Sequence, residues 1–342
     1  MTENNFISEL ENALKQLPSE ERNDILQDLR EYFTNGRKDG KTDSEIASSL
    51  GSPTKIAEEL LATYSFAVND IPDEISNELI TLQNDSYTNV DINVQHGALV
   101  VRPSNDSVTT IELIGPHEKL ELSAEVIGNT LTIRLKNLRH WLFMFNFNMR
   151  AVTVNVFIPK KVYQSFAMKS VNGSIDAEKL LGNKVTAKSD NGKIQLKEIA
   201  ASSVTAETDN GRIVLEKVQA DHVKTETDNG RIEMQYVEAD TIFAESDNGR
   251  IVFEHVDGAV TGTTDNGKII LQTASLDRNI DLKTDNGSIF VESRSKPTNV
   301  SIHAKTGNGR IDVFGERNSR TVIGAGDNVI RLKSDNGRIT VK

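Results

Sequence analysis

The sequence predicts a mainly β protein: a parallel β-solenoid (β-helix) of about nine 19-residue coils with an irregular β cap, preceded by a small N-terminal α-helical domain. A short turn motif recurs nine times, and apolar and polar residues alternate on either side of each copy. The segment 1–66 shows helical spacing instead. We therefore expect a helical docking domain at 1–66, a linker at 67–85, a β cap at 86–168 and the repeats at 169–342.

The repeated motif reads [Ser/Thr]-Asp-Asn-Gly-[Arg/Lys]-Ile, as in Ser189–Ile194. Its glycines lie at 173, 192, 211, 230, 249, 267, 287, 309 and 337, so the first four steps are equal. Asn-Gly is a turn signal because both residue types tolerate positive φ. The predicted structural turns comprise Asn191, Gly192, Asn210, Gly211, Asn229, Gly230, Asn248, Gly249, Asn266 and Gly267.

Alternation around each motif predicts strands with one buried face, for example Val204, Ala206 and Thr208 before a turn. Two architectures fit this pattern. In a parallel solenoid each unit is one coil, and equivalent residues stack about 4.8 Å apart. In an antiparallel meander each Asn-Gly closes a hairpin through a type I′ turn. We favour the solenoid because stacking explains why like residues recur in register.

Stacking would also align the charged residues that flank each turn. We expect an acidic ladder beside a basic one, each acid pairing with a base of its own or the adjacent coil, at about 0–1 kcal/mol per exposed pair. Calcium binding is not expected, because the Gly-Gly-x-Gly-x-Asp repeat is absent and bases lie beside the acids. The ladder residues are Asp190, Lys193, Asp209, Arg212, Asp228, Arg231, Asp247, Arg250, Asp265 and Lys268.

The segment before the repeats contains six predicted strands, which we expect to cover the open end of the solenoid. One apolar stretch within it contains the only tryptophan. It fits either a core plug for the cap or an exposed patch for a partner or a membrane surface. The candidate partner residues are Trp141, Leu142, Phe143, Met144, Phe145 and Phe147.

Residues 1–66 predict three to four short helices. Phe6, Leu10 and Leu14 share one helical face, the second helix is expected to end near Gly36, and a capping box at Thr42–Glu45 precedes the third. The stretch 45–57 has helix-turn-helix spacing, but residues 1–64 carry seven Lys/Arg against thirteen Asp/Glu, a net charge of −6. An acidic surface repels DNA phosphates, so we expect the helices to dock a protein and no nucleic acid to bind.

Composition narrows the function further. The net charge is −11 and there is no cysteine, so thiolate metal sites and cysteine nucleophiles are excluded. No zinc-binding histidine pair, nucleophile elbow, phosphate loop or dinucleotide fingerprint occurs, so we predict no cofactor, metal or catalysis. With no signal peptide and no transmembrane stretch in the sequence, we expect a cytoplasmic protein by default, with surface association open.

Two resemblances follow from these residues. Residues 1–64 resemble the HAAS signalling domain of Gram-positive bacteria, through the face of Phe6, the pair Tyr32-Phe33 and the segment Leu50–Pro53. Residues 86–342 resemble the DUF4097 adhesin-like β-strand-repeat family, through the repeated Asp-Asn-Gly-[Arg/Lys]-Ile. The second resemblance implies a β-repeat fold, no known catalysis and an association with cell-envelope stress sensing.

Three functions remain open at this level. The favoured one is a non-enzymatic binding scaffold in envelope-stress signalling, whose helical head docks a protein partner and whose solenoid presents a binding surface. The second is an adhesin-like surface protein that binds a cell-envelope polymer or itself. The third is a polysaccharide-acting solenoid enzyme, which the scarcity of aromatic residues in the repeats disfavours.

Overall fold

The computed structural model describes residues 1–17, 19–38, 40–58, 61, 77–83, 86–115, 120–137 and 152–342. The described helices belong to one compact unit and the described strands to another. Each unit has its own apolar core, and each is described by itself below. Residues 67–76 of the predicted linker lie outside the described residues, but residues 77–82, which were also assigned to it, form a strand of the β unit. The aromatic stretch with Trp141 lies entirely outside the described residues.

The helical unit contains α1 (Glu3–Ala13), α2 (Ser19–Lys38) and α3 (Asp43–Leu50), and residues 53–58 are also helical. Its core includes Phe6, Leu10 and Phe33, all fully buried, and the Phe6 and Phe33 rings meet edge to face at 5.7 Å. The apolar spacing that predicted these helices therefore marks their buried faces.

The predicted capping box of α3 is confirmed, since Thr42 and Glu45 each accept a hydrogen bond from the other's backbone N–H. Gly51 ends α3 with φ of 88°. The second helix ends near Gly36 as expected, two residues farther along at Lys38. A Cβ at Gly36 would lie 2.7 Å from Cδ1 of Ile46, so the glycine is needed for close packing of α2 on α3.

The β unit begins with nine described strands before the regular repeats. They are β1 (Asn77–Leu82), β2 (Asn89–Val94), β3 (Ala98–Pro103), β4 (Thr109–Ile114), β5 (Leu120–Ile127), β6 (Thr130–Asn137), β7 (Thr153–Ile158), β8 (Val162–Ser170) and β9 (Ile175–Glu178). The six strands predicted between 86 and 168 correspond to β2–β7.

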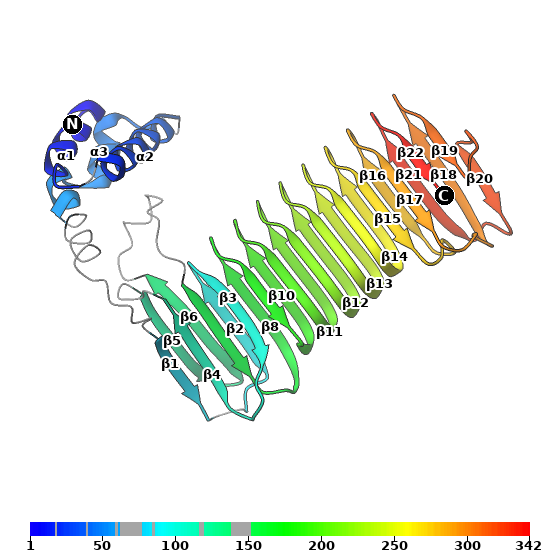
Figure 1. Cartoon of the computed structure of the whole chain (residues 1–342), viewed down its shortest axis with the longest axis horizontal. Helices are drawn as coiled ribbons and strands as arrows, with labels where there is room; N and C mark the ends of the chain where they lie inside the picture. The colour runs from blue at the N-terminus through cyan, green and yellow to red at the C-terminus, as the bar shows by residue number, and fades with distance from the viewer. Residues whose placement is uncertain are drawn as a thin grey trace. The chain divides into compact units, whose positions relative to one another are not determined.

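The repeats form the remaining strands (Figure 1). They are β10 (Leu181–Ser189), β11 (Ile194–Thr208), β12 (Ile213–Thr227), β13 (Ile232–Ser246), β14 (Ile251–Thr264), β15 (Ile269–Thr273), β16 (Ile280–Thr284), β17 (Ile289–Ser293), β18 (Val300–Thr306), β19 (Ile311–Val313), β20 (Arg320–Ile323), β21 (Asn328–Ser334) and β22 (Ile339–Val341).

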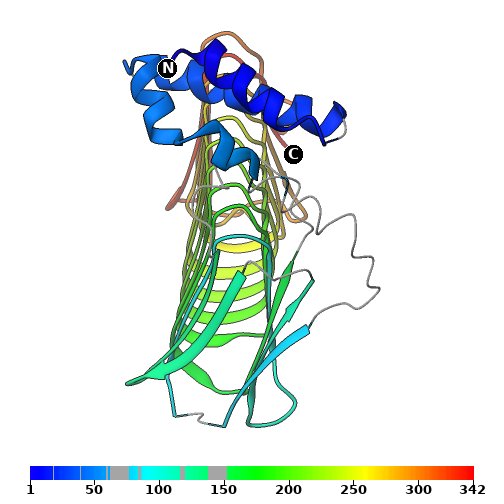
Figure 2. The ribbon, with the colours of Figure 1, turned by 90° about the vertical axis from the view of Figure 1, so that its left-hand side faces the viewer.

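Successive repeat units pair in parallel, so the coil arrangement is right and the hairpin alternative is wrong. Ile194 pairs with Ile213, Ile213 with Ile232, and Ile232 with Ile251. Figure 2 shows the coils one behind another. Because equivalent residues stack, each apolar position of the motif becomes a continuous buried column inside the stack.

Each long strand from β11 to β14 bends once, so one coil contributes to two rows of strands. One row runs β5-β6-β2-β8-β10-β11-β12-β13-β14-β16-β21-β18-β20, and the other runs β1-β4-β7-β3-β9-β11-β12-β13-β14-β15-β17-β22-β19. The coils therefore have two edges. We call the edge with the Asn-Gly motifs the turn edge, and the opposite one the bend edge.

The coil order in space differs from the chain order at both ends. The coil of β2 and β3 lies between the β6/β7 layer and the β8/β9 coil. Likewise the last coil, β21 with β22, lies between the β16/β17 coil and the β18/β19 coil. The cap predicted as irregular thus contains a regular coil, and antiparallel strands β1, β4 and β5 complete it.

Candidate functional site

The turn edge carries a column of buried hydroxyls, one from the Ser or Thr that opens each motif. The Thr208 hydroxyl accepts the N–H of Gly211 in its own turn at 3.2 Å and donates to the carbonyl of Gly192 in the preceding coil at 3.2 Å. Ser189 and Ser246 make the same two bonds. The motif therefore needs a small hydroxyl residue here because that hydroxyl joins two coils.

The turn glycines form a second column, for a reason other than the one the sequence suggested. None of the motif glycines or asparagines, all of which lie among the described residues, has φ in the left-handed region. A Cβ on Gly211 would instead lie 1.9 Å from the carbonyl oxygen of Gly192, and one on Gly230 would lie 1.7 Å from that of Gly211. The expected positive φ is therefore wrong, and glycine is required because successive turns approach too closely for a side chain.

The asparagines form a third column on the outer side of the same edge. Each amide donates through Nδ2 to Oδ1 of the preceding asparagine: Asn191 to Asn172, Asn210 to Asn191 and Asn229 to Asn210, all at 2.8 Å. The column continues through Asn248, Asn266, Asn286, Asn336 and Asn308. Its last two members confirm that the final coil lies second from the end.

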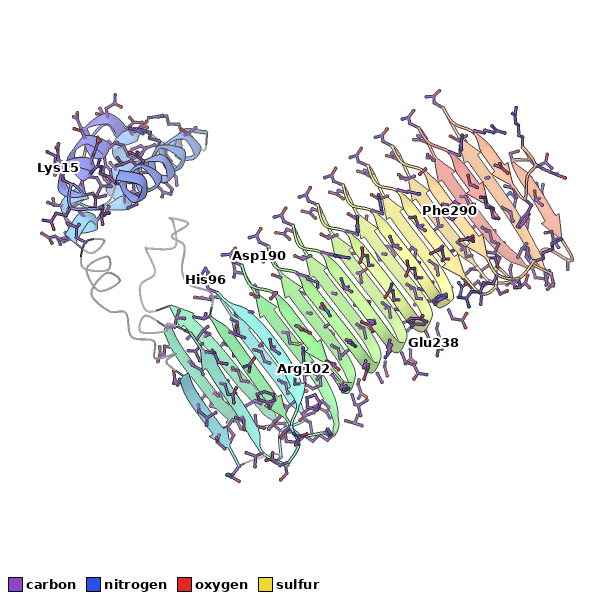
Figure 3. All side chains as sticks on the ribbon, viewed as in Figure 1. Lys15, His96, Arg102, Asp190, Glu238 and Phe290 are labelled. Carbon is purple, nitrogen blue, oxygen red and sulfur yellow. The ribbon has the colours of Figure 1, made fainter. Side chains whose placement is uncertain are left out.

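The flanking charges lie on the turn edge, where Figure 3 labels Asp190, but the expected acid–base pairing is wrong. No ion pair among the described residues joins a motif aspartate to a motif base. Arg212 and Arg231 pair with Glu233 instead, the latter at 2.9 Å. Burial raises the pKa of Glu233, but the two guanidinium groups outweigh it and the net shift is downward. The motif aspartates are left facing solvent, or pair with a lysine two residues earlier, as Asp285 does with Lys283.

The bend edge was not predicted at all. Its bend residues have positive φ without being glycine: Lys179 (58°), Glu198 (52°), Lys217 (55°), Tyr236 (56°) and His255 (53°). They recur at the spacing of the repeat, but no single residue type occupies the position, so the repeated motif gives no sequence signal for them. Positive φ is unfavourable for such side chains, and the coil geometry imposes it.

The bend residues contact one another along the stack. Lys217 lies 3.3 Å from Glu198, and the rings of Tyr236 and His255 stack at 5.0 Å. Arg294 reaches His255 Nε2 at 3.2 Å. Beside them, Figure 3 labels Glu238 on this edge, opposite Asp190. The edge thus presents varied exposed groups on an invariant backbone, which is how repeat proteins build binding surfaces.

Comparison with protein families decides the identity of this fold. The DUF4097 model, described as toastrack DUF4097, matches residues 87–342. The chain belongs to the DUF4097 toastrack family. A second model, HAAS, matches residues 5–59, so the chain joins a HAAS domain to a toastrack domain, in agreement with both resemblances.

Solved structures resemble the chain at low identity. A candidate adhesin from Bacteroides fragilis is 18% identical, with 65% of this chain and 100% of that chain covered and a TM-score of 0.42. A candidate adhesin from Parabacteroides distasonis is 13% identical, covering 78% and 98%, with a TM-score of 0.48. A comparison with curated proteins returned no match. Likeness at this level supports no functional argument.

In the HAAS domain, charge is concentrated where the helix ends meet. Arg37 near the end of α2 pairs with Glu3 of α1 and, at 2.8 Å, with Asp43 of α3. The hydrogen bond from Arg37 lowers the pKa of Asp43, and the backbone bond from Thr42 lowers that of Glu45. These contacts hold three helices together around one guanidinium group.

The described residues contain no group of three or more His, Cys, Asp or Glu placed to hold a metal ion. No helix within the same ranges has the length and apolar character needed to cross a bilayer. The candidate partner patch at Trp141–Phe147 stays a prediction, because it falls outside those ranges.

Proposed function

We propose that this toastrack protein is a non-enzymatic binding scaffold: the HAAS domain docks a protein partner, and the β-solenoid presents a binding surface along its length. The observation that carries the proposal is that the repeated motif residues hold the coils together. The motif hydroxyls, glycines and asparagines are all engaged in coil-to-coil contacts. The repeated motif therefore makes the stack rigid. A rigid stack can present the side chains that lie outside the motif at fixed positions on its surface.

The variable groups of the bend edge support this division of roles. Lys217, Tyr236 and His255 occupy equivalent places on successive coils, yet differ in charge and shape. The residues that join the coils are of the same kind in each unit, whereas the bend residues differ from unit to unit. This pattern suits recognition of a partner better than catalysis of one reaction.

The HAAS domain supports a separate docking role because it has a core of its own. Fourteen of its described apolar residues, from Phe6 to Ala57, are buried together, independently of the solenoid core. A unit that folds around its own core can engage one partner while the solenoid engages another. We connect that partner to cell-envelope stress signalling because of the family resemblance.

Proximity labelling in cells tests the docking role directly. The full chain and a variant without residues 1–66 are each fused to the labelling enzyme at the C-terminus, and their labelled neighbours are compared. The proposal expects a protein set that disappears with the deletion while other neighbours remain. If the two sets are the same, the HAAS domain does not dock.

The non-enzymatic part of the proposal has its own test. The full chain is incubated with cell-wall and pectin-like polysaccharides, and reducing ends are measured over time. We expect binding at most and no release of reducing ends. Turnover of any of these polymers that depends on the chain refutes the scaffold proposal.

A further inference from the structure

The first regular coils have apolar residues at an outward position that is polar farther along the stack. Leu181 pairs in register with Val162 on one side and with Ala200 on the other. The same row continues as Gln219, Glu238 and Asp257. Val162 is 68% exposed and Leu181 is 45% exposed, so two large apolar side chains face solvent where later coils place polar ones.

A cavity opens beside Leu181, which is one of its lining residues. It measures about 290 Å³ and lies between the end of β7, the start of β8 and the bend after β9. Its wall includes Ile158, Tyr163, Phe166 and Leu180, each of them at most 2% exposed. The Tyr163 hydroxyl donates to the carbonyl of Pro159 at 2.9 Å, and the ring packs on Phe166 at 4.6 Å, so the tyrosine presents its ring to the cavity wall rather than an unsatisfied hydroxyl.

The rim of the cavity is cationic, although the chain as a whole carries a net charge of −11. Lys160, Lys161 and Lys179 line it, against a single carboxylate, Glu198. That carboxylate is already shared, because it lies 3.3 Å from Lys217 and 3.9 Å from Lys179. Lys179 itself also pairs with Glu178 at 3.2 Å, so Lys160 and Lys161 are the rim lysines outside this pair. Lys161 lies over the Tyr87 ring at 4.5 Å and the Tyr163 ring at 5.2 Å, which places positive charge directly above the apolar wall.

We propose that this cavity binds a medium-chain fatty acid, with the hydrocarbon tail along the exposed side chain of Leu181 and the carboxylate among the rim lysines. An exposed apolar side chain beside a cluster of ammonium groups is complementary to an amphiphilic anion. The cavity lies at the small end of the range for small-molecule sites, which favours a short tail over a long one. The proposal is independent of the docking role of the HAAS domain, and either can fail alone.

Calorimetric titration of the full chain with octanoate tests the proposal. Each buried methylene strengthens binding about four-fold, so hexanoate should bind about fifteen-fold more weakly than octanoate. Acetate, which has the head group alone, and octanol, which has the tail alone, should each bind far more weakly than octanoate. If octanoate does not bind, or if acetate binds as well as octanoate does, the proposal is wrong.

Two variants place the ligand, and one variant serves as a matched control. Lys179→Gln removes a rim charge and should weaken octanoate binding about two- to five-fold. Leu181→Asn makes the mouth polar and should weaken binding to a similar degree, whatever happens to the lysine variant. Lys217→Gln changes the same kind of bend residue, with the same Glu198 partner, away from the cavity, and should leave binding unchanged. Equal weakening by Lys179→Gln and Lys217→Gln refutes the assignment.

A membrane is the alternative source of the same chemistry, and vesicles distinguish it. The full chain is mixed with phosphatidylglycerol vesicles, and bound protein is separated by flotation. Octanoate binding without flotation supports the free fatty acid. Flotation that Leu181→Asn abolishes, together with no octanoate binding, overturns the proposal in favour of a membrane-contact surface.

Discussion

Replacing Gly211 by alanine adds a methyl group where two neighbouring turns meet. The new Cβ would lie 1.9 Å from the Gly192 carbonyl oxygen and 2.8 Å from the Thr208 hydroxyl. Neither neighbour can move alone, because the Gly192 carbonyl accepts from Thr208 and the adjacent asparagines are bonded at 2.8 Å. Forcing the turns apart adds an overpacking cost of about 1–3 kcal/mol to the loss of about two hydrogen bonds, at about 1 kcal/mol each. We expect a total loss of about 3–5 kcal/mol.

Urea unfolding followed by circular dichroism at the strand signal measures this loss. Gly128→Ala is the comparison, since Gly128 has φ of 58° but nothing within contact of its Cβ, so only about 1 kcal/mol of backbone strain is expected. Gly211→Asn separates the two explanations for the turn glycine, because asparagine tolerates positive φ but carries a larger side chain. If Gly211→Asn is tolerated, or if Gly211→Ala costs no more than Gly128→Ala, close approach is not the reason for glycine.

Three further predictions concern the other contacts. Thr208→Val removes the hydroxyl and leaves the Gly211 N–H and the Gly192 carbonyl without that partner, so the free energy of unfolding in urea should fall by about 2 kcal/mol. Thr208→Ser keeps the hydroxyl and should be nearly neutral, so equal effects of the two variants would contradict the hydroxyl column. Asn229→Asp removes the donor to Asn210 and should lower the free energy of unfolding by about 1 kcal/mol at neutral pH. Below about pH 4 the protonated carboxyl group can donate again, so part of this stability should return, and the urea midpoint of the variant measured against pH tests this. In the HAAS domain, the pKa of Asp43 is lowered from 3.8 by its bond from Arg37, so its stabilisation is fully present above 3.8 and disappears as the pH falls through the lower folded value. The thermal midpoint of the helical signal should therefore fall on acidification in that window, and Asp43→Asn should reduce the fall; an unchanged acid response in the variant would count against the ion pair.

Much of the fold was predictable because a repeat multiplies weak local signals. Alternation at Val204, Ala206 and Thr208 indicates a buried strand face, and its recurrence at a constant spacing indicates stacking. The capping box at Thr42 was predictable because its two bonds join residues that are close in the sequence. In both cases the contacts that decide the structure are local or periodic.

The mistaken expectations concern contacts between coils. Asn-Gly is common in turns with positive φ, yet here the turn is shaped by the turn of the preceding coil, and glycine relieves a clash that no local pattern reveals. Ion pairing failed for a similar reason, because Arg212 reaches Glu233 in the next coil rather than its neighbouring aspartates. Gly97 was missed as the first member of the glycine column because its turn, Gln95-His96-Gly97, lacks the motif, although its carbonyl contacts Gly173 as the later glycines contact one another.

The spatial order of the end coils could not be predicted from the sequence either. The motif at Ser334–Ile339 is as regular as any other, so the chain order suggests that its coil comes last. The pairing of β21 with both β16 and β18 instead places it between two earlier coils. The last strands of the chain, β21 and β22, are thereby paired on two sides, which opposes fraying of the chain end. The apolar cavity was missed for the same reason, since it joins residues from β7, β8 and the bend after β9.

A distance measurement between spin labels tests the central claim that one repeat unit advances the stack by one strand. The chain has no cysteine, so labels at Arg212→Cys and Arg338→Cys attach at these two exposed positions alone. The registers through Ile213, Ile232, Ile251, Ile269, Ile289 and Ile339 place the labelled residues five coil steps apart, or about 24 Å. The predicted result is a double electron–electron resonance distance centred at about 24 Å. A distance of about 60 Å, as expected if each of six consecutive units were a two-stranded hairpin, would contradict the stacked-coil account.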